Sequence, residues 1–294
     1  MGAYIQLIRP KDWAKNLFLF IPVFFAGKIF DITTALHLLG GFVCFSLVAS
    51  SIYIMNDYRD IEDDLKHHIK KSRPLASGAV SKLHAIVICI VFLLIGLTAA
   101  FFIRDKFMFV LGIYLLLNIG YSFGLKNIPI LDIIIVSIGF VLRVKAGAVI
   151  AMIGLSEWLT IMIFLLALFM ALAKRRDDVL LKLSSGTDMR KTVKGYNLEF
   201  INVALSLICA VIIVAYFMYT TSPEIKERLH YRLYYTCLFV LAGVFRYLQL
   251  IFVLQDSQSP TKILYKDHFI QIVIILWIVS FYTILYLKNI TIFN

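Results

Sequence analysis

The sequence predicts an all-α polytopic membrane protein with nine membrane-spanning helices. Of its 294 residues, 61% are hydrophobic and only 16% are charged, and the mean hydropathy is +0.88. These values lie far outside the range of soluble globular chains. The apolar residues also gather in runs of about 20, the length that an α-helix needs to cross the hydrocarbon core of a bilayer. We therefore expect the chain to be embedded in a membrane.

Nine such runs follow one another along the chain. They lie near residues 14–30, 34–56, 83–103, 107–125, 130–150, 157–174, 199–219, 231–254 and 268–288. No Gly/Ser-rich linker, low-complexity tract or soluble segment interrupts them. We therefore expect residues 1–294 to form a single domain.

The orientation of the bundle follows from its basic loops. If the N-terminus is cytoplasmic, the loops on that side hold most of the 29 Lys and Arg residues. Because cytoplasmic loops of membrane proteins are enriched in Lys and Arg, the N-terminus is expected inside and, with nine spans, the C-terminus outside. The end of the second run then faces the cytoplasm.

The net charge of +11 also comes from basic residues in the loops between the apolar runs. The basic residues lie between apolar runs and not in a basic tail or on a folded basic face, so no nucleic acid partner is expected. Anionic lipid headgroups and phosphorylated substrates are the expected partners. The four cysteines all lie inside apolar runs without metal or disulfide spacing, so they predict neither a zinc site nor a disulfide framework.

The stretch at residues 50–78 begins as the polar end of the second run. In it Asn56, Asp60 and Asp64 recur every four residues, so they share one face of a helix. Five of the eight residues from 57 to 64 are acidic, although the macrodipole disfavours carboxylates at the C-terminal end of a helix. Oxygen ligands from carboxylates, with the other positions left to water and phosphate, suit Mg²⁺. The alternative is a solvated acidic loop without a special role.

Cations follow these acids within nine residues, namely Lys66, Lys70, Lys71 and Arg73. A metal on one side with ammonium and guanidinium groups on the other is what a bound diphosphate needs. Three other polar residues are expected to open on the same side of the membrane: Lys15, Tyr53 and Lys126.

Basic residues also fall inside the predicted spans, where charges usually face a cavity or a partner. Arg143 and Lys145 are two residues apart and point in different directions on a helix. We expect Arg143 to face the cavity and Lys145 to extend toward the membrane surface. For Arg246 two alternatives stay open: a functional role, or contact with headgroups or a loop acid.

These motifs resemble those of a known family. NDYRDIEDD matches the first aspartate-rich motif, NDxxDxxxD, of the UbiA-type intramembrane prenyltransferases, and KSRPLASG resembles the basic segment that follows it there. The loop at residues 172–196 departs from the second aspartate-rich motif of members that prenylate aromatic acceptors. There Asp177 and Asp178 are adjacent and follow three basic residues, Lys174, Arg175 and Arg176. With RPKDWAKNLFLFIPVFFAG and YSFGLKNIPILDIIIVSIGFVLR, this loop is similar to the decaprenyl-phosphate phosphoribosyltransferase branch.

The resemblance implies a nine-helix UbiA-like bundle that forms one catalytic domain, with its site on the cytoplasmic face of the inner membrane. It implies a Mg²⁺-dependent transfer of phosphoribosyl from 5-phosphoribose 1-diphosphate to a polyprenyl phosphate, with release of diphosphate. The expected metal ligands are Asn56, Asp60 and Asp64, with Asp57 as an alternate. Catalytic roles are expected for Asp60, Asp64, Lys70 and Arg73.

The substrate-binding residues divide into two sets. Expected around the diphosphate are Lys15, Tyr53, Lys70 and Arg73. Expected at the 5-phosphate and the lipid phosphate, without a division between them, are Lys126, Arg143, Lys174 and Arg175.

Two other functions remain open from the sequence. The first is transfer of a prenyl group from a prenyl diphosphate to an aromatic or other acceptor, since the same acidic motif serves that reaction. The second is cation transport, with the acids as a vestibule. The prenyl chain length, the pathway and the oligomeric state are not indicated by the sequence.

Overall fold

The computed structural model describes residues 2–66, 70–185, 195–229, 233–254 and 266–286. Over these residues all regular structure is helical, and six helices are long and apolar enough to cross a membrane. A further apolar helix, α13 (His268–Tyr286), is not among these six. The prediction of an all-α multi-pass protein is therefore confirmed, while the count of nine spans and the orientation stay predictions. The chain forms two compact units, Met1–Leu155 and Ser156–Asn294, which are described separately.

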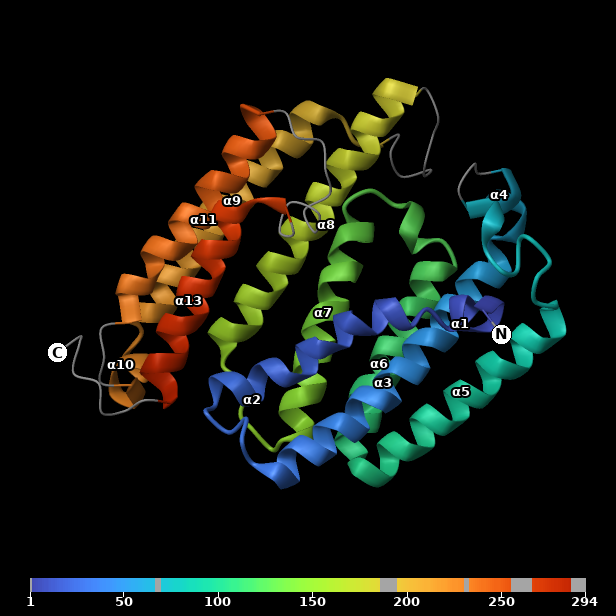
Figure 1. The fold of residues 1–294 in the computed structure, drawn as a ribbon, viewed down its shortest axis with the longest axis horizontal. Coiled ribbons are helices and arrows are strands. Elements are labelled where there is room, and N and C mark those ends of the chain that lie inside the picture. The colour runs from blue at the N-terminus through green and yellow to red at the C-terminus, as the bar shows by residue number, and fades with distance from the viewer. Residues whose placement is uncertain (1, 67–69, 186–194, 230–232, 255–265, 287–294) are drawn as a thin grey trace. The chain divides into compact units, whose positions relative to one another are not determined.

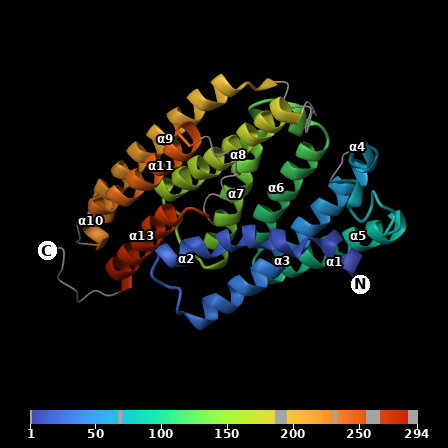
Figure 2. The ribbon, with the colours of Figure 1, turned by 45° about the horizontal axis from the view of Figure 1, so that its top comes forward.

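The first unit contains four helices of 18 residues or more together with shorter segments (Figure 1). In chain order these are α1 (Gly2–Ile8), η1 (Pro10–Phe20), α2 (Ile21–Phe25), α3 (Ile32–Arg59), α4 (Ile61–Lys66), η2 (Lys70–Ser72), α5 (Lys82–Ile103), α6 (Asp105–Ser122), η3 (Leu125–Asn127) and α7 (Leu131–Ile150). Helix α5 packs along α3, and the dark blue segment η1 packs against both α3 and α7 (Figures 1 and 2).

Small residues allow these helices to approach closely, as is common between helices in membranes. A Cβ atom added at Gly96 of α5 would lie 3.1 Å from the carbonyl oxygen of Cys44 on α3. At Gly147 of α7 an added Cβ would lie only 1.8 Å from the carbonyl oxygen of Leu19 in η1. The backbone of η1 therefore rests directly on α7, and this contact fixes where the N-terminal segment lies.

The first predicted span, near residues 14–30, is not a continuous α-helix. This part of the chain holds the 11-residue 3₁₀ helix η1, which begins earlier at Pro10, and the 5-residue helix α2, and residues 26–30 are not helical. Pro22 has no N–H to donate to the preceding turn, and the Ile21 N–H bonds the carbonyl of Phe18 in 3₁₀ fashion. Because a 3₁₀ helix rises more per residue, the two pieces still extend over about 30 Å, which matches the hydrocarbon core.

The second unit contains a further set of helices: α8 (Glu157–Ser185), α9 (Leu198–Thr221), α10 (Pro223–Leu229), η5 (Leu233–Thr236), α11 (Cys237–Phe252) and α13 (His268–Tyr286). Within this unit α9 packs against α8 and α11, and α11 packs against α13. A buried polar chain joins three of the elements. Trp277 Nε1 donates to the Tyr216 hydroxyl at 2.8 Å, and that hydroxyl lies 2.7 Å from Thr236 Oγ1.

Candidate active site

The acidic motif lies at the C-terminal end of α3. Helix α3 ends at Arg59, Asp60 is its cap residue, and α4 begins at Ile61. The Asp60 N–H donates to the Asn56 carbonyl at 3.0 Å, and the Asp64 N–H donates to the Asp60 carbonyl at 2.8 Å. The one-turn spacing of Asn56, Asp60 and Asp64 therefore continues across the junction of α3 and α4.

Two of the acids are buried and are bonded to arginine. Asp57 is 2% exposed and Asp64 is 3% exposed. Arg9 Nη2 donates to both oxygens of Asp57, at 2.5 and 2.8 Å. Arg73 Nη1 donates to Asp57 Oδ1 at 3.0 Å and to Asp64 Oδ2 at 2.8 Å. Arg73 therefore joins Asp57 to Asp64, seven residues further along the chain.

The third acid is bonded to a lysine from the loop between α6 and α7. Lys126 Nζ in η3 donates to both oxygens of Asp60, at 2.8 and 2.7 Å. Beside it Arg59 donates to the Ser122 carbonyl, and its guanidinium carbon lies 4.5 Å from the centre of the Phe123 ring. These contacts hold the loop against the end of α3.

We name these six charged residues the α3 cluster: Arg9, Asp57, Asp60, Asp64, Arg73 and Lys126. Its three carboxylates face three cations. In the part of the chain that the structure describes, no group of three His, Cys, Asp or Glu residues is arranged to hold a metal ion. Each of the three carboxylates is instead paired with at least one cation.

The residues of the predicted metal site nevertheless fit a divalent cation. Asn56 Oδ1 is buried and accepts no hydrogen bond from the residues that the structure describes. Leaving a buried acceptor without a donor costs about 1–3 kcal/mol, and a cation beside it would remove this cost. An amide oxygen next to carboxylates is also the kind of ligand set that Mg²⁺ prefers.

Tyr53 lies one turn before Asp57 on α3 and has two cations over its ring. The guanidinium carbon of Arg9 lies 5.3 Å from the ring centre and Lys15 Nζ lies 5.8 Å from it. Lys15 also donates to Asp12 Oδ1 at 2.6 Å. The structure thus brings Lys15 and Tyr53 together, with Arg9 as an additional neighbour.

Arg143 points into the core of the first unit and is 5% exposed, while Lys145 is exposed. The Arg143 guanidinium donates to three neutral acceptors: Asn16 Oδ1 at 2.9 Å, the Gly139 carbonyl at 2.9 Å and the Tyr114 hydroxyl at 2.8 Å. The rings of Phe45, Tyr114 and Phe140 lie within 5.3 Å of its guanidinium carbon. Arg143 therefore fastens η1 to α6 and α7.

The basic residues of the second predicted motif lie near the end of α8. Lys174 is exposed, whereas Arg175 is 4% exposed and donates to Asp178 one turn further on. Arg176 Nε donates to Asn202 Oδ1 on α9 at 3.0 Å. Residues 186–194 of the loop predicted at 172–196 lie outside the described residues. The predicted diphosphate ligand Lys70 is half-buried in η2.

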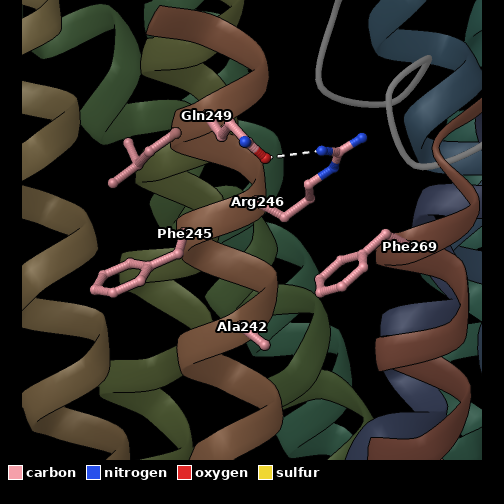
Figure 3. Close-up of a pocket in the computed structure, with 6 residues that line it drawn as sticks. Ala242, Phe245, Arg246, Gln249 and Phe269 are labelled. Atoms are coloured by element: carbon pink, nitrogen blue, oxygen red, sulfur yellow. Dashed lines mark hydrogen bonds between the residues drawn. The ribbon is translucent and has the colours of Figure 1, made fainter. Parts of the chain in front are cut away.

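Arg246 on α11 contacts a loop acid, which was one of its two expected alternatives. Its Nε and Nη2 donate to Asp267 Oδ2 at 3.1 and 2.8 Å, and its Nη1 donates to Gln249 at 2.7 Å. These bonds hold the pKa of the Asp267 carboxyl below its usual value. Arg246 and Phe269 line a hollow of about 530 Å³ between α11 and α13, and Figure 3 shows Phe245 turned away from Arg246.

Sequence reasoning did not assign Arg9 or Tyr114 to the site. Arg9 carried a signal, since it stands with Lys11 and Lys15 at the mouth of the first span. Tyr114 is a single tyrosine within an apolar run, so no spacing distinguished it from a core residue.

Comparison with known proteins shows the family to which the chain belongs. Residues 17–273 match the model of the UbiA prenyltransferase family. A decaprenyl-phosphate phosphoribosyltransferase of Corynebacterium glutamicum is 35% identical over 216 residues, which is 72% of this chain and 65% of that protein. The enzyme of the same name from Mycolicibacterium smegmatis is 32% identical over 228 residues, or 76% of this chain and 72% of that protein. The match therefore spans just under two thirds of the first relative.

Solved structures share the fold. A UbiA homolog from Archaeoglobus fulgidus bound to DMAPP and Mg²⁺ superposes with a TM-score of 0.69 at 22% identity, covering 96% of this chain and 99% of that one. A digeranylgeranylglyceryl phosphate synthase gives a TM-score of 0.68 at 18% identity, covering 97% and 98%. At these identities the likeness is one of fold alone.

Proposed function

Because the chain belongs to the UbiA prenyltransferase family, we propose that it is a membrane transferase that moves phosphoribosyl from 5-phosphoribose 1-diphosphate to a polyprenyl phosphate. The observation that carries the proposal is the α3 cluster, in which carboxylates and cations meet beside the buried oxygen of Asn56. Such a site suits a diphosphate with a divalent ion. The names of the relatives favour phosphoribosyl as the group transferred.

Asn56, Asp60 and Asp64 would hold Mg²⁺. When bound, the ion would neutralise the diphosphate and so make it a better leaving group. Arg73 contacts Asp64 directly, so in the proposed complex it donates to the diphosphate oxygens instead, and Lys126 leaves Asp60 for one of the other two phosphates. Lys15, Tyr53 and Lys70 complete this side of the proposed site.

The reaction needs no strong base from the protein. A phosphate oxygen of the lipid attacks the anomeric carbon, a new C–O bond forms, and the C–O bond to the diphosphate breaks. Because the attacking oxygen is already ionised at neutral pH, no proton has to be removed. Stabilising the charge that develops on the leaving diphosphate is therefore the main task of the α3 cluster.

The remaining cations are proposed for the other two phosphates. Lys126, Lys174 and Arg175 are candidates for the 5-phosphate of the donor and for the phosphate of the lipid. Arg143 stays a candidate only through a rearrangement, because its described hydrogen bonds go to Asn16, Gly139 and Tyr114.

We further propose that both units form one catalytic domain of nine spans. The family match supports this, because it runs from residue 17 to residue 273 and crosses the junction of the units at residue 155. The distribution of basic loops supports a cytoplasmic N-terminus and a site that faces the cytoplasm from the inner membrane.

The experiment that tests the function offers labelled donors to the purified full chain in lipid nanodiscs. With labelled 5-phosphoribose 1-diphosphate, polyprenyl phosphate and Mg²⁺, we expect a labelled lipid product and one diphosphate released for each product. Excess chelator should stop the reaction, and added Mg²⁺ should restore it. Transfer of label from a prenyl diphosphate to an aromatic acceptor, without phosphoribosyl transfer, would identify a prenyltransferase instead.

A further inference from the structure

Asp57 differs from the other acids of the α3 cluster in its position on the helix. It follows Asn56 directly, so it is turned by about 100° from the face that Asn56, Asp60 and Asp64 share. Its side chain is only 3% exposed. The carboxylate contacts the guanidinium groups of Arg9 and Arg73. Asp57 therefore faces a different set of partners from the proposed metal ligands.

Arginine takes most of the acceptor capacity of Asp57. Its Oδ1 accepts from Arg9 Nη2 and from Arg73 Nη1, and its Oδ2 accepts from Arg9 Nη2. A carboxylate offers about four lone-pair positions, so three accepted hydrogen bonds leave little room for a metal ion. Asp60 and Asp64, by contrast, are each paired with a single cation among the described residues.

The two arginines keep donors for a further ligand. Each guanidinium has five N–H donors, and the hydrogen bonds of the described residues use one nitrogen of each, Nη2 of Arg9 and Nη1 of Arg73. Their side chains are 25% and 29% exposed, so the remaining donors can reach a ligand in water. Each guanidinium is a planar fork that matches phosphate oxygens, and one carboxylate holds both of these groups in place.

The backbone at Arg9 supports the same role. Arg9 has φ 56° and ψ 57°, a left-handed conformation that is unfavourable for any residue with a Cβ. Its neighbours hold it there, because Ser50 Oγ donates to the Ile8 carbonyl at 2.8 Å and the Asp12 N–H donates to the Arg9 carbonyl at 2.9 Å. Strain that surrounding contacts maintain is typical of functional positions.

We propose that Asp57 is a positioning residue, whose buried carboxylate holds Arg9 and Arg73 as a fork for the diphosphate oxygens of the donor, and that it does not bind the divalent ion. This inference rests on the proposed function only through the diphosphate, which phosphoribosyl and prenyl donors share. Arg9 becomes a substrate-binding residue of the site, beside Arg73.

The test compares Asp57→Asn with Asp60→Asn in the full chain in nanodiscs. Mn²⁺ alone, followed by electron paramagnetic resonance, reports the metal site. Inorganic pyrophosphate, titrated calorimetrically in the presence of chelator, reports the anion site. Asp57→Asn should keep the Mn²⁺ affinity within about twofold but lose about tenfold or more in pyrophosphate affinity, since a charge-assisted hydrogen bond is lost. Asp60→Asn should show the opposite pattern.

Coupling between Asp57 and Arg9 separates positioning from a structural role. Because Asp57 holds Arg9 as well as Arg73, the double variant Asp57→Asn/Arg9→Gln should lose less pyrophosphate affinity than the product of the two single losses. Losses that multiply would overturn the proposal. If Asp57→Asn does not fold, the pyrophosphate affinities of Arg9→Gln and Arg9→Lys are compared instead, because Arg9 is more exposed than Asp57. Arg9→Lys should then bind pyrophosphate more tightly than Arg9→Gln, and equal binding by both variants and the unmodified chain would overturn the proposal.

Turnover gives an additional measurement. Asp57→Asn should raise the KM for the donor about tenfold, with kcat changed less than about threefold and the KM for the lipid unchanged. A loss of Mn²⁺ affinity equal to that of Asp60→Asn would show that Asp57 binds the metal, and unchanged pyrophosphate affinity would leave it a structural role only. If the unmodified chain does not transfer phosphoribosyl, the proposed function fails, while the Mn²⁺ and pyrophosphate titrations still decide the role of Asp57.

Discussion

Replacing Gly147 by alanine should displace the N-terminal segment from α7. The added Cβ would lie 1.8 Å from the carbonyl oxygen of Leu19, 2.7 Å from its carbonyl carbon and 2.9 Å from its Cα. Real Cβ contacts are essentially never shorter than 3.0 Å, so η1 would have to retreat by about 1.2 Å. Because every one of these atoms belongs to the backbone, no side-chain rotation can relieve the contact.

The expected loss of stability follows from this displacement. Overpacking of this kind costs about 1–3 kcal/mol. Asn16, one 3₁₀ turn before Leu19, donates to Ser46 and accepts from Arg143, both at 2.9 Å, and a shift of about 1 Å would weaken both bonds. With about 0.5–1.5 kcal/mol for each bond, the free energy of unfolding should fall by about 2–6 kcal/mol.

Unfolding in mixed detergent and donor turnover in nanodiscs measure the two consequences. Turnover should fall by up to about 100-fold, because η1 carries Lys15 and follows Arg9, and a displacement of 1 Å at a site can have an effect of that size. Gly112→Ala on α6 is the matched control, since a Cβ there meets nothing within 4 Å. If Gly147→Ala is as stable and as active as Gly112→Ala, then η1 does not rest on Gly147 and the reasoning is wrong.

Three further substitutions test other parts of the site. Asp60→Ala should abolish turnover while the protein stays folded, because the residue is paired at the edge of the bundle and not in its apolar core. Circular dichroism measures folding and labelled product measures turnover. Retained activity would remove the proposed metal role. Arg175→Ala should raise the KM for the phosphoribosyl donor about tenfold and leave the KM for the lipid unchanged, since one charged contact to a phosphate is lost; an effect on the lipid alone would reverse the assignment. Arg143→Lys should destabilise the chain by about 3 kcal/mol in a detergent unfolding titration. One ammonium group cannot replace three guanidinium hydrogen bonds to separate acceptors. Unchanged stability would contradict the inference that Arg143 holds η1 against α6 and α7.

Several features of the site were accessible from the sequence because they depend on local spacing. The four-residue recurrence of Asn56, Asp60 and Asp64 predicted a shared helix face, and the backbone hydrogen bonds keep that spacing through the end of α3. The opposite directions of Arg143 and Lys145 followed in the same way from the helical repeat. The first span was predicted as one apolar run, but spacing alone did not reveal that η1 would be a 3₁₀ helix.

Partners that lie far apart in the chain could not be predicted. Arg9 and Asp57 are 48 residues apart, Lys126 and Asp60 are 66 apart, and Arg143 and Asn16 are 127 apart. The sequence offered several cations for each acid, and nothing in it ranked them. Which cation reaches which acid depends on how η1 and η3 lie against the end of α3.

The sequence by itself determined that the chain is a helical membrane protein with the motifs of the UbiA family, and it predicted that the acids and the cations after them form one polar site. Apolar run length, helical periodicity and motif spacing are local properties, so the order of residues is enough to state them. Only the tertiary structure decided that Asp57 faces two arginines, that Lys126 reaches Asp60 and that Arg143 is held by neutral acceptors. Those pairings are set by the close packing of segments distant in the chain, where a contact such as that of Gly147 with Leu19 fixes the position of a whole segment.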